Sequence, residues 1–212
     1  MPGLVSQVDT TSDIYLNNHE VQSAAVAALN EQMAVAAAGG GERYVARHHQ
    51  RGRLLARERI ELLLDRDAPF MELSALAAWG TEFNVGAAIV TGVGVISGVE
   101  CMIIAHDPTV RGGTMNPYTL RKNLRALEIA RVNRLPVMYL VESGGADLPT
   151  QSELFVHAGR IFRDLTDLSS QGIPTVALVF GNSTAGGAYV PGMCDYCVLV
   201  DQQAKVFLGG PP

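Results

Sequence analysis

The chain has 212 residues, of which 48% are apolar and 17% charged, a composition that excludes a disordered protein and suffices for one well-buried core. Its net charge of −5 argues against nucleic-acid binding, for which a basic chain is expected. No apolar run has the length of a membrane span, and residues 1–11 lack the basic start and apolar core of a signal peptide. We therefore expect a cytoplasmic protein with neither a nucleic-acid nor a membrane partner.

The first forty residues predict an extension that precedes the main domain. Residues 1–18 carry no clear pattern, and we expect them to be loosely ordered. The alanine-rich segment Val21–Ala38 has apolar side chains at helical spacing, and the Gly39–Gly41 run would end this helix. We divide the chain into an extension over residues 1–40 and a domain over residues 41–212.

An arginine-dense segment follows, and its arginines allow two interpretations. They could face an anionic ligand such as a nucleotide phosphate. The acidic residues Glu42, Glu58 and Glu61 between them favour the other interpretation, a solvated face. A helix is expected over Ala56–Leu64. The arginines are Arg43, Arg47, Arg51, Arg53, Arg57 and Arg59.

From Pro69 onward, strands and helices alternate. All-apolar strands that lead into helices are typical of an α/β layered fold with a buried sheet. The expected strands are 70–78, 87–96, 100–105, 136–141, 174–180, 196–200 and 205–208, and the expected helices are 116–132, 150–170 and a short one from Gly186.

Two of these strands run directly into a glycine pair that opens a helix. Val137–Val141 leads to Gly144 and Gly145, and Val176–Phe180 leads to Gly186 and Gly187. Glycine lets a ligand approach the backbone, and the first N–H groups of a helix have no intrahelical acceptor. Two such turns at one place would form an oxyanion hole from main-chain donors alone. Close packing of helix on strand is the structural alternative for either pair.

A third glycine turn, Asp107–Thr114, also lies between a strand and a helix. Arg111 in this turn could meet a phosphate group or could cap the helix that begins near Asn116.

Three other patterns are weaker. The glycines at 92, 94 and 98 do not form a dinucleotide loop, because β-type residues continue through them and no helix follows. Ser183 lies in a sequence close to the nucleophile elbow of hydrolases, but only His106 and His157 in the folded part could serve it. Cys194 and Cys197 supply two of the four ligands that a structural zinc needs, so no metal is expected.

Four longer segments are distinctive as a set: RERIELLLD at 57–65, VECMIIA at 99–105, SGGA at 143–146 and TAGGAYVP at 184–191. Together they resemble the carboxyltransferase (β) subunit of biotin-dependent acyl-CoA carboxylases. The similarity runs from about residue 40 to 212. RGGT at 111–114 and LGGPP at 208–212 resemble the branch that contains the methylcrotonyl-CoA enzymes, within a family that also includes propionyl-CoA carboxylases.

The resemblance implies a crotonase-like fold (ClpP/crotonase superfamily) built from ββα units behind the helical extension. It implies a ligase that transfers a carboxyl group from carboxybiotin, carried on a biotin carboxylase/biotin carrier α subunit, to an acyl-CoA. A homo-oligomer of β subunits, in the form of a hexamer, is also implied. The base is commonly the biotin itself after it loses CO2, so no protein base is required.

Site residues follow from the same resemblance. The peptides of Gly145–Ala146 and Gly186–Gly187 would hold the thioester oxygen of the enolate, each donor contributing on the order of 3 kcal/mol. The expected substrate-binding residues are Arg111, Gly112, Gly113, Gly144 and Tyr189.

Two departures from the family pattern matter. Asp147 stands where many members have arginine or an aromatic residue, which bears on the choice of acyl group. Family subunits also have a second crotonase-like domain, so the chain is expected to be an N-terminal half that does not complete the transfer alone.

Two alternatives stay open. A crotonase-type enoyl-CoA hydratase or isomerase would use the same enolate site with a carboxylate base, for which Glu142 and Asp147 are the nearest candidates. A truncated subunit that only assembles with partners would have no activity.

Overall fold

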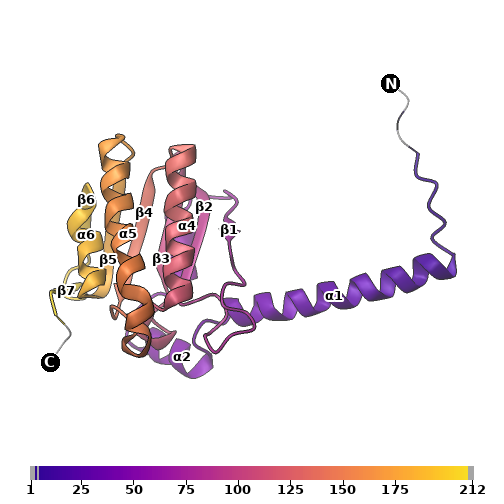
Figure 1. Ribbon diagram of the computed structural model, residues 1–212, viewed down its shortest axis with the longest axis horizontal. Coiled ribbons are helices and arrows are strands. Elements are labelled where there is room, and N and C mark those ends of the chain that lie inside the picture. Colours follow the sequence, from indigo (N-terminus) through magenta and orange to yellow (C-terminus); the bar gives the residue numbers. More distant parts are fainter. Residues whose placement is uncertain (1–2, 4, 210–212) are drawn as a thin grey trace.

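The computed structural model describes residue 3 and residues 5–209, and its centre is a seven-stranded sheet (Figure 1). The order β1-β2-β3-β4-β5-β6 follows the chain, and β7 pairs with β5 beyond the end of β6. The pairs β1–β2 and β2–β3 are antiparallel, and all later pairs are parallel. The strands are β1 (Met71–Leu73), β2 (Ile89–Ile96), β3 (Val99–His106), β4 (Val137–Ser143), β5 (Thr175–Thr184), β6 (Tyr196–Leu199) and β7 (Lys205–Phe207).

One face of the sheet is covered by α4 (Pro117–Asn133) and α5 (Gln151–Ser170), which lie side by side in Figure 1, with α6 (Gly186–Met193) next to α5. This layer holds the larger core, because alternate residues of β4 and β5 point into it. Its fully buried members include Val137, Tyr139, Val141, Ala177, Val179, Leu127, Leu165 and Leu168.

The other face carries α3 (Ala56–Leu63), as expected from the apolar side of that helix. Ala56 and Ile60 of α3 pack there against Ile103 and Leu140, which come from β3 and β4. The side chains of β4 therefore alternate between the two cores, and Glu142 follows Leu140 in this alternation.

A side-chain cap fixes where α4 begins. The Oδ1 atom of Asn116 accepts hydrogen bonds from the backbone N–H groups of Tyr118 (2.9 Å) and Thr119 (3.0 Å), and Pro117 occupies the first turn. These are the preferred residues for a helix start. Asn116 itself, and not Arg111, therefore supplies the cap.

The N-terminal extension is more ordered than expected. Helix α1 begins at Asp13 and ends at Ala37, and the Ser12 hydroxyl accepts a hydrogen bond from the N–H of Tyr15. The expectation of loose order up to residue 18 was therefore wrong, because this cap starts the helix eight residues before Val21. Helix α1 projects away from the sheet, and Ala36 is its one buried residue (Figure 1).

Two further differences concern the segments that follow. The arginine-dense segment contains a helix, α2 (Glu42–Gln50), which the sequence interpretation did not assign. The strand expected over 70–78 is β1 alone, because its edge pairs with β2 over three residues and the backbone then turns through positive φ at Ser74 and Ala78. No helix in the described part of the chain is both long and apolar enough to span a membrane.

Candidate active site

The three glycine turns follow three neighbouring strands. Strands β3, β4 and β5 are adjacent and parallel, so their carboxyl ends meet at one edge of the sheet. Clefts at this edge are where open α/β sheets bind ligands. The turns contain Asp107–Thr114, Ser143–Asp147 and Thr184–Gly187.

The first two turns are packed tightly together. The hydroxyl of Ser143 donates a hydrogen bond to the carbonyl of Gly113 (3.0 Å), and the N–H of Gly144 donates to the carbonyl of Gly112 (3.0 Å). Gly144 was expected to bind substrate, but its N–H is used inside the protein. What it contributes to the site is the absence of a side chain.

A short bridge extends this contact. The N–H of Met115 donates to the carbonyl of Gly145 (2.7 Å), and the N–H of Asp147 donates to the carbonyl of Met115 (2.9 Å). Ala146 lies between these two bonds and is exposed. Its N–H takes no part in the bridge and donates to no acceptor in the described part of the chain.

The second and third turns also touch. Ser143 and Ser183 are partners across β4 and β5. A Cβ built on Gly145 would lie 3.0 Å from the carbonyl oxygen of Thr184, and one on Gly187 would lie 3.2 Å from the Oγ of Ser143. The structure therefore brings the two glycine turns into direct contact.

The third turn holds two further N–H groups without acceptors among the described residues, one on the exposed Gly186 and one on the buried Gly187. Gly186 and Gly187 are the first two residues of α6, where N–H groups have no intrahelical acceptor, and neither donates elsewhere within the described residues. Ala185, just before them, has φ 49° and ψ −118° and donates its N–H to Phe207 (2.9 Å). Such strained backbone is concentrated at functional sites.

The remaining expected substrate residue, Tyr189, lies on α6 and is half-exposed. Its ring is 5.0 Å from that of Phe162 on α5. It therefore faces the α5 side of the third turn, apart from Arg111 in the first turn.

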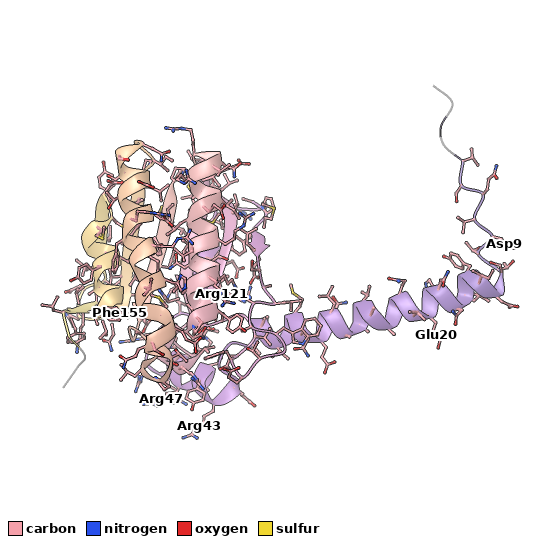
Figure 2. All side chains as sticks on the ribbon, viewed as in Figure 1. Asp9, Glu20, Arg43, Arg47, Arg121 and Phe155 are labelled. Atoms are coloured by element: carbon pink, nitrogen blue, oxygen red, sulfur yellow. The ribbon has the colours of Figure 1, made fainter. Side chains whose placement is uncertain are left out.

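An arginine-lined cavity of about 430 Å³ opens beside the first turn. Arg111 and Gly112 form one wall, and Arg47 and Arg51 from the α2 region form another. Arg43 and Arg47 project from α2 at the same end of the molecule (Figure 2). The cavity lies next to the glycine turns because Gly112 belongs both to its wall and to the bond with Gly144. Arg47 and Arg51 were not among the predicted site residues, although the arginine density of their segment was the available signal.

The two carboxylates proposed as bases for a hydratase are both engaged. Glu142 is buried, with Arg59 Nη2 at 2.6 Å from its Oε2 and Arg53 Nη1 hydrogen-bonded to its Oε1. Asp147 accepts a hydrogen bond from the Thr150 hydroxyl (3.0 Å) and lies 3.5 Å from Arg111 Nη1. Neither carboxylate is a free base.

The interpretation of the arginine segment as a solvated face was wrong for Arg53, Arg57 and Arg59, whereas Arg43, Arg47 and Arg51 are exposed. Arg59 is 4% exposed, and Arg57 makes a two-pronged ion pair with Glu72 (2.6 and 2.9 Å). Arg57 and Arg59 are two positions apart on one short helix. Their side chains therefore point in different directions and reach different partners. Sequence alone did not reveal those partners, because they lie on β1 and β4.

A buried histidine belongs to the same cluster. His48 of α2 lines the arginine cavity, and its Nε2 is 4.0 Å from Oε2 of Glu142. Burial is the main cause that lowers the pKa of His48, Glu142 opposes this effect, and the Arg59 charge adds to it. The neutral imidazole is therefore favoured beside two guanidinium groups.

Three glycine turns, with main-chain N–H groups that have no acceptor among the described residues, thus lie at one edge of an α/β sheet. The chain belongs to the carboxyl transferase domain family, whose model matches residues 47–212. Residues 210–212, part of the LGGPP segment, lie outside the described residues. The family match and the solved structures below confirm the crotonase-like α/β fold.

Three similar proteins place the chain within that family. It is 61% identical to a probable biotin-dependent acyl-coenzyme A carboxylase β2 subunit of Mycobacterium tuberculosis, over 99% of this chain and 40% of the relative. The geranyl-CoA carboxylase β subunit of Pseudomonas aeruginosa superposes with a TM-score of 0.89 at 43% identity, over 100% of this chain and 41% of the other.

The third similar protein is transcarboxylase 12S, described as a hexamer assembly with hydrolysed methylmalonyl-coenzyme A bound. It superposes with a TM-score of 0.80 at 31% identity, over 88% of this chain and 37% of the other. The chain thus spans about two fifths of the length of these proteins.

Proposed function

We propose that this chain is the acyl-CoA-binding part of the carboxyltransferase β subunit of a biotin-dependent acyl-CoA carboxylase. The observation that carries the proposal is the contact between two turns whose N–H groups have no acceptor in the part of the chain that the structure describes. Ala146, Gly186 and Gly187 offer these donors at one edge of the sheet. Membership of the carboxyl transferase family supports it.

The chemistry required of these donors is specific. Removing a proton next to a thioester places negative charge on the thioester oxygen. Main-chain donors fixed by packed turns stabilise that charge without reorganising, and each contributes about 3 kcal/mol. The bonds from Ser143 and Gly144 to the first turn keep the donors in place before substrate arrives.

The arginine-lined cavity is proposed to take the phosphate end of coenzyme A. Arg47, Arg51 and Arg111 line it, and guanidinium groups match phosphate oxygens in charge and geometry. Phosphates held here would anchor the thioester relative to the turns, because Gly112 joins the cavity to the second turn. Gly113 and Tyr189 are kept as substrate-binding residues in this proposal.

The exposed main-chain donors are accessible to a biotin that is carried on another protein. Gly186 and Ala146 are exposed, so a group carried on another protein can reach both. Of the two lysines, the residue type that carries biotin, Lys122 is buried with its ammonium bound to the carbonyls of Gly86 and Ile89, and Lys205 is exposed on β7. Carboxybiotin would supply CO2 and, after losing it, the base.

The partners follow from this role. We propose a biotin carboxylase/biotin carrier α subunit as the source of the cofactor, a homo-hexamer of β subunits, and a cytoplasmic location. Without the rest of the β subunit, this part is proposed not to complete the transfer.

The test is carboxylation by the full-length β subunit with its biotinylated partner. Acetyl-, propionyl- and methylcrotonyl-CoA would be supplied with ATP and labelled bicarbonate. Label in at least one acyl-CoA is expected. No turnover of any of them would contradict the proposal and favour a non-catalytic subunit, and hydration of an enoyl-CoA without biotin would favour a hydratase.

A further inference from the structure

One buried charge cluster lies directly behind the β4 turn. The carboxylate of Glu142 stands one residue before Ser143 and four before Ala146. It pairs with Arg59 of α3 and with Arg53 of the loop between α2 and α3, and it packs against the backbone of Gly181 in β5. His48 of α2 lies 4.0 Å from its Oε2.

The Glu142 side chain occupies the space that a side chain at position 181 would need. A Cβ on Gly181 would lie 2.5 Å from Oε1 of Glu142 and 2.6 Å from its carboxyl carbon. The Arg59 guanidinium in turn lies over the Phe180 ring, 4.4 Å from its centroid. The carboxylate, the guanidinium and the ring therefore lock β4, β5 and α3 together at one level of the sheet.

The main chain of Glu142 also packs against the first turn. Its carbonyl oxygen would be 2.3 Å from a Cβ on Gly113, and Ser143 next to it donates its hydroxyl to the Gly113 carbonyl. A shift of Glu142 would therefore move the first and second turns together.

We infer that Arg53, Arg59 and Glu142 are positioning residues that set the place of the Gly145–Ala146 donor. The inference rests on the proposed function, since it assigns a purpose to the support behind that donor. Neither arginine touches substrate. Each acts through the Glu142 side chain on the turn that follows it.

The physical reason is the sensitivity of an oxyanion hole to small displacements. Donors must stand at hydrogen-bond distance from the developing oxyanion, and misplacement by about 1 Å costs about 100-fold in rate. Hydrogen bonds from guanidinium groups to a carboxylate are directional. They therefore restrict the position of the strand end more than apolar packing does.

The first variant is Arg59→Lys in the full-length β subunit assembled with its biotinylated partner. Lysine keeps the charge and loses the planar contact with Glu142 and Phe180. We expect kcat to fall about tenfold or more, while KM for acyl-CoA and the Kd for CoA change less than about twofold.

The matched control is Arg57→Lys on the same helix. Arg57 also pairs with a carboxylate, here through two hydrogen bonds, but its partner Glu72 lies on β1, near the start of the first turn and three strands from β4. This variant is expected to lower thermal stability as Arg59→Lys does and to keep kcat. Equal kcat losses in both variants would overturn the inference, because the effect would then be one of general stability.

A second variant displaces the carboxylate without removing any charge. Gly181→Ala places its Cβ against the Glu142 carboxyl group, so it should lower kcat as Arg59→Lys does. If Arg59→Lys yields no assembled subunit, Gly181→Ala and Arg53→Lys decide the matter, since the Arg53 side chain is 25% exposed and tolerates change better. Unchanged kcat in both would overturn the inference.

A spectroscopic readout separates this inference from the proposed function. Hydrogen bonds to the thioester oxygen lower the C=O stretching frequency of bound, ¹³C-labelled acyl-CoA. No shift in the unmodified subunit would mean that no oxyanion hole exists, and the proposed function itself would fail. A shift that persists unchanged in Arg59→Lys and Gly181→Ala would overturn the positioning role alone, whereas its loss there supports that role.

Discussion

Gly113 packs against the main-chain carbonyl of Glu142, and a Cβ atom at position 113 would lie 2.3 Å from that oxygen. The contact joins the turn after β3 to the end of β4. Its neighbour Gly112 has almost the same backbone conformation, with φ 68° against 70°, and has open space around it. The two glycines therefore separate the effect of backbone strain from that of close approach.

We expect Gly113→Ala to be much more damaging than Gly112→Ala. Both substitutions place alanine at positive φ, which costs about 1 kcal/mol. Gly113→Ala must in addition push the first turn off β4, and we expect a further loss of at least about 2 kcal/mol. Thermal unfolding of the two variants of the full-length subunit measures the difference, and equal melting temperatures would contradict the contact.

A second prediction concerns the donor at Gly186. Proline has no N–H and is tolerated at the first position of a helix, so Gly186→Pro removes one proposed donor. Because Ala185 has ψ −118°, outside the extended range that the residue before proline prefers, the melting temperature of this variant must be measured beside its kcat. A Cβ at this position meets nothing within 4 Å, which makes Gly186→Ala the matched control. We expect the proline variant to lose at least about tenfold in kcat and the alanine variant to keep most of it.

The choice of Gly186 over Gly187 matters for that experiment. A Cβ on Gly187 would lie 3.2 Å from Ser143 Oγ, so any substitution there mixes steric and hydrogen-bonding effects. Full activity of Gly186→Pro would assign the third turn a packing role and leave Ala146 as the main donor.

A third prediction tests the arginine cavity. Arg47→Ala and Arg51→Ala should raise KM for acyl-CoA about tenfold each with little change in kcat, because a hydrogen bond to a charged group contributes about 1.5–3 kcal/mol. Arg43 lies on the same helix but does not line the cavity, so Arg43→Ala should leave KM within about twofold. The same rise in all three variants would indicate a general charge effect without a specific site.

The strands, helices and glycine turns around the proposed site were largely predictable from the sequence, because their signals are local. Apolar runs such as Val137–Val141 and glycine pairs next to them appear within ten residues. The family resemblance then gave the fold class, which the comparisons confirm.

The support behind the turns was not predictable, because it depends on pairs far apart in sequence. Arg59 and Glu142 are 83 positions apart, and the charge pattern around Arg59 looks like that of an exposed helix. Arg53 and Arg59 are held by a partner whose burial depends on the whole sheet. The prediction for the N-terminal extension was wrong for a different reason, because Ser12 was not recognised as a helix cap.

The last prediction concerns pH and His106, which ends β3. This histidine is 2% exposed, its Nδ1 has no hydrogen-bond partner among residues 5–209, and burial is the main cause that lowers its pKa from 6.5 to about 4. Because the folded state favours the neutral ring, the unfolded chain takes up the proton first as the pH falls. The stabilising contribution is therefore fully present above about pH 6.5 and is lost as the pH falls toward 4, by about 2 kcal/mol between pH 7 and pH 5.

Urea unfolding of the full-length subunit across this pH range measures that loss. The His106→Gln variant should show a shallower fall in unfolding free energy, even if it is less stable at neutral pH. His48, whose pKa is also lowered, contributes in the same direction and accounts for part of the slope that remains. His19→Gln, at an exposed position on α1, should leave the slope unchanged. If His106→Gln has the same slope as the unmodified subunit, the ring is protonated equally in both states, and the effect of burial on its pKa is refuted.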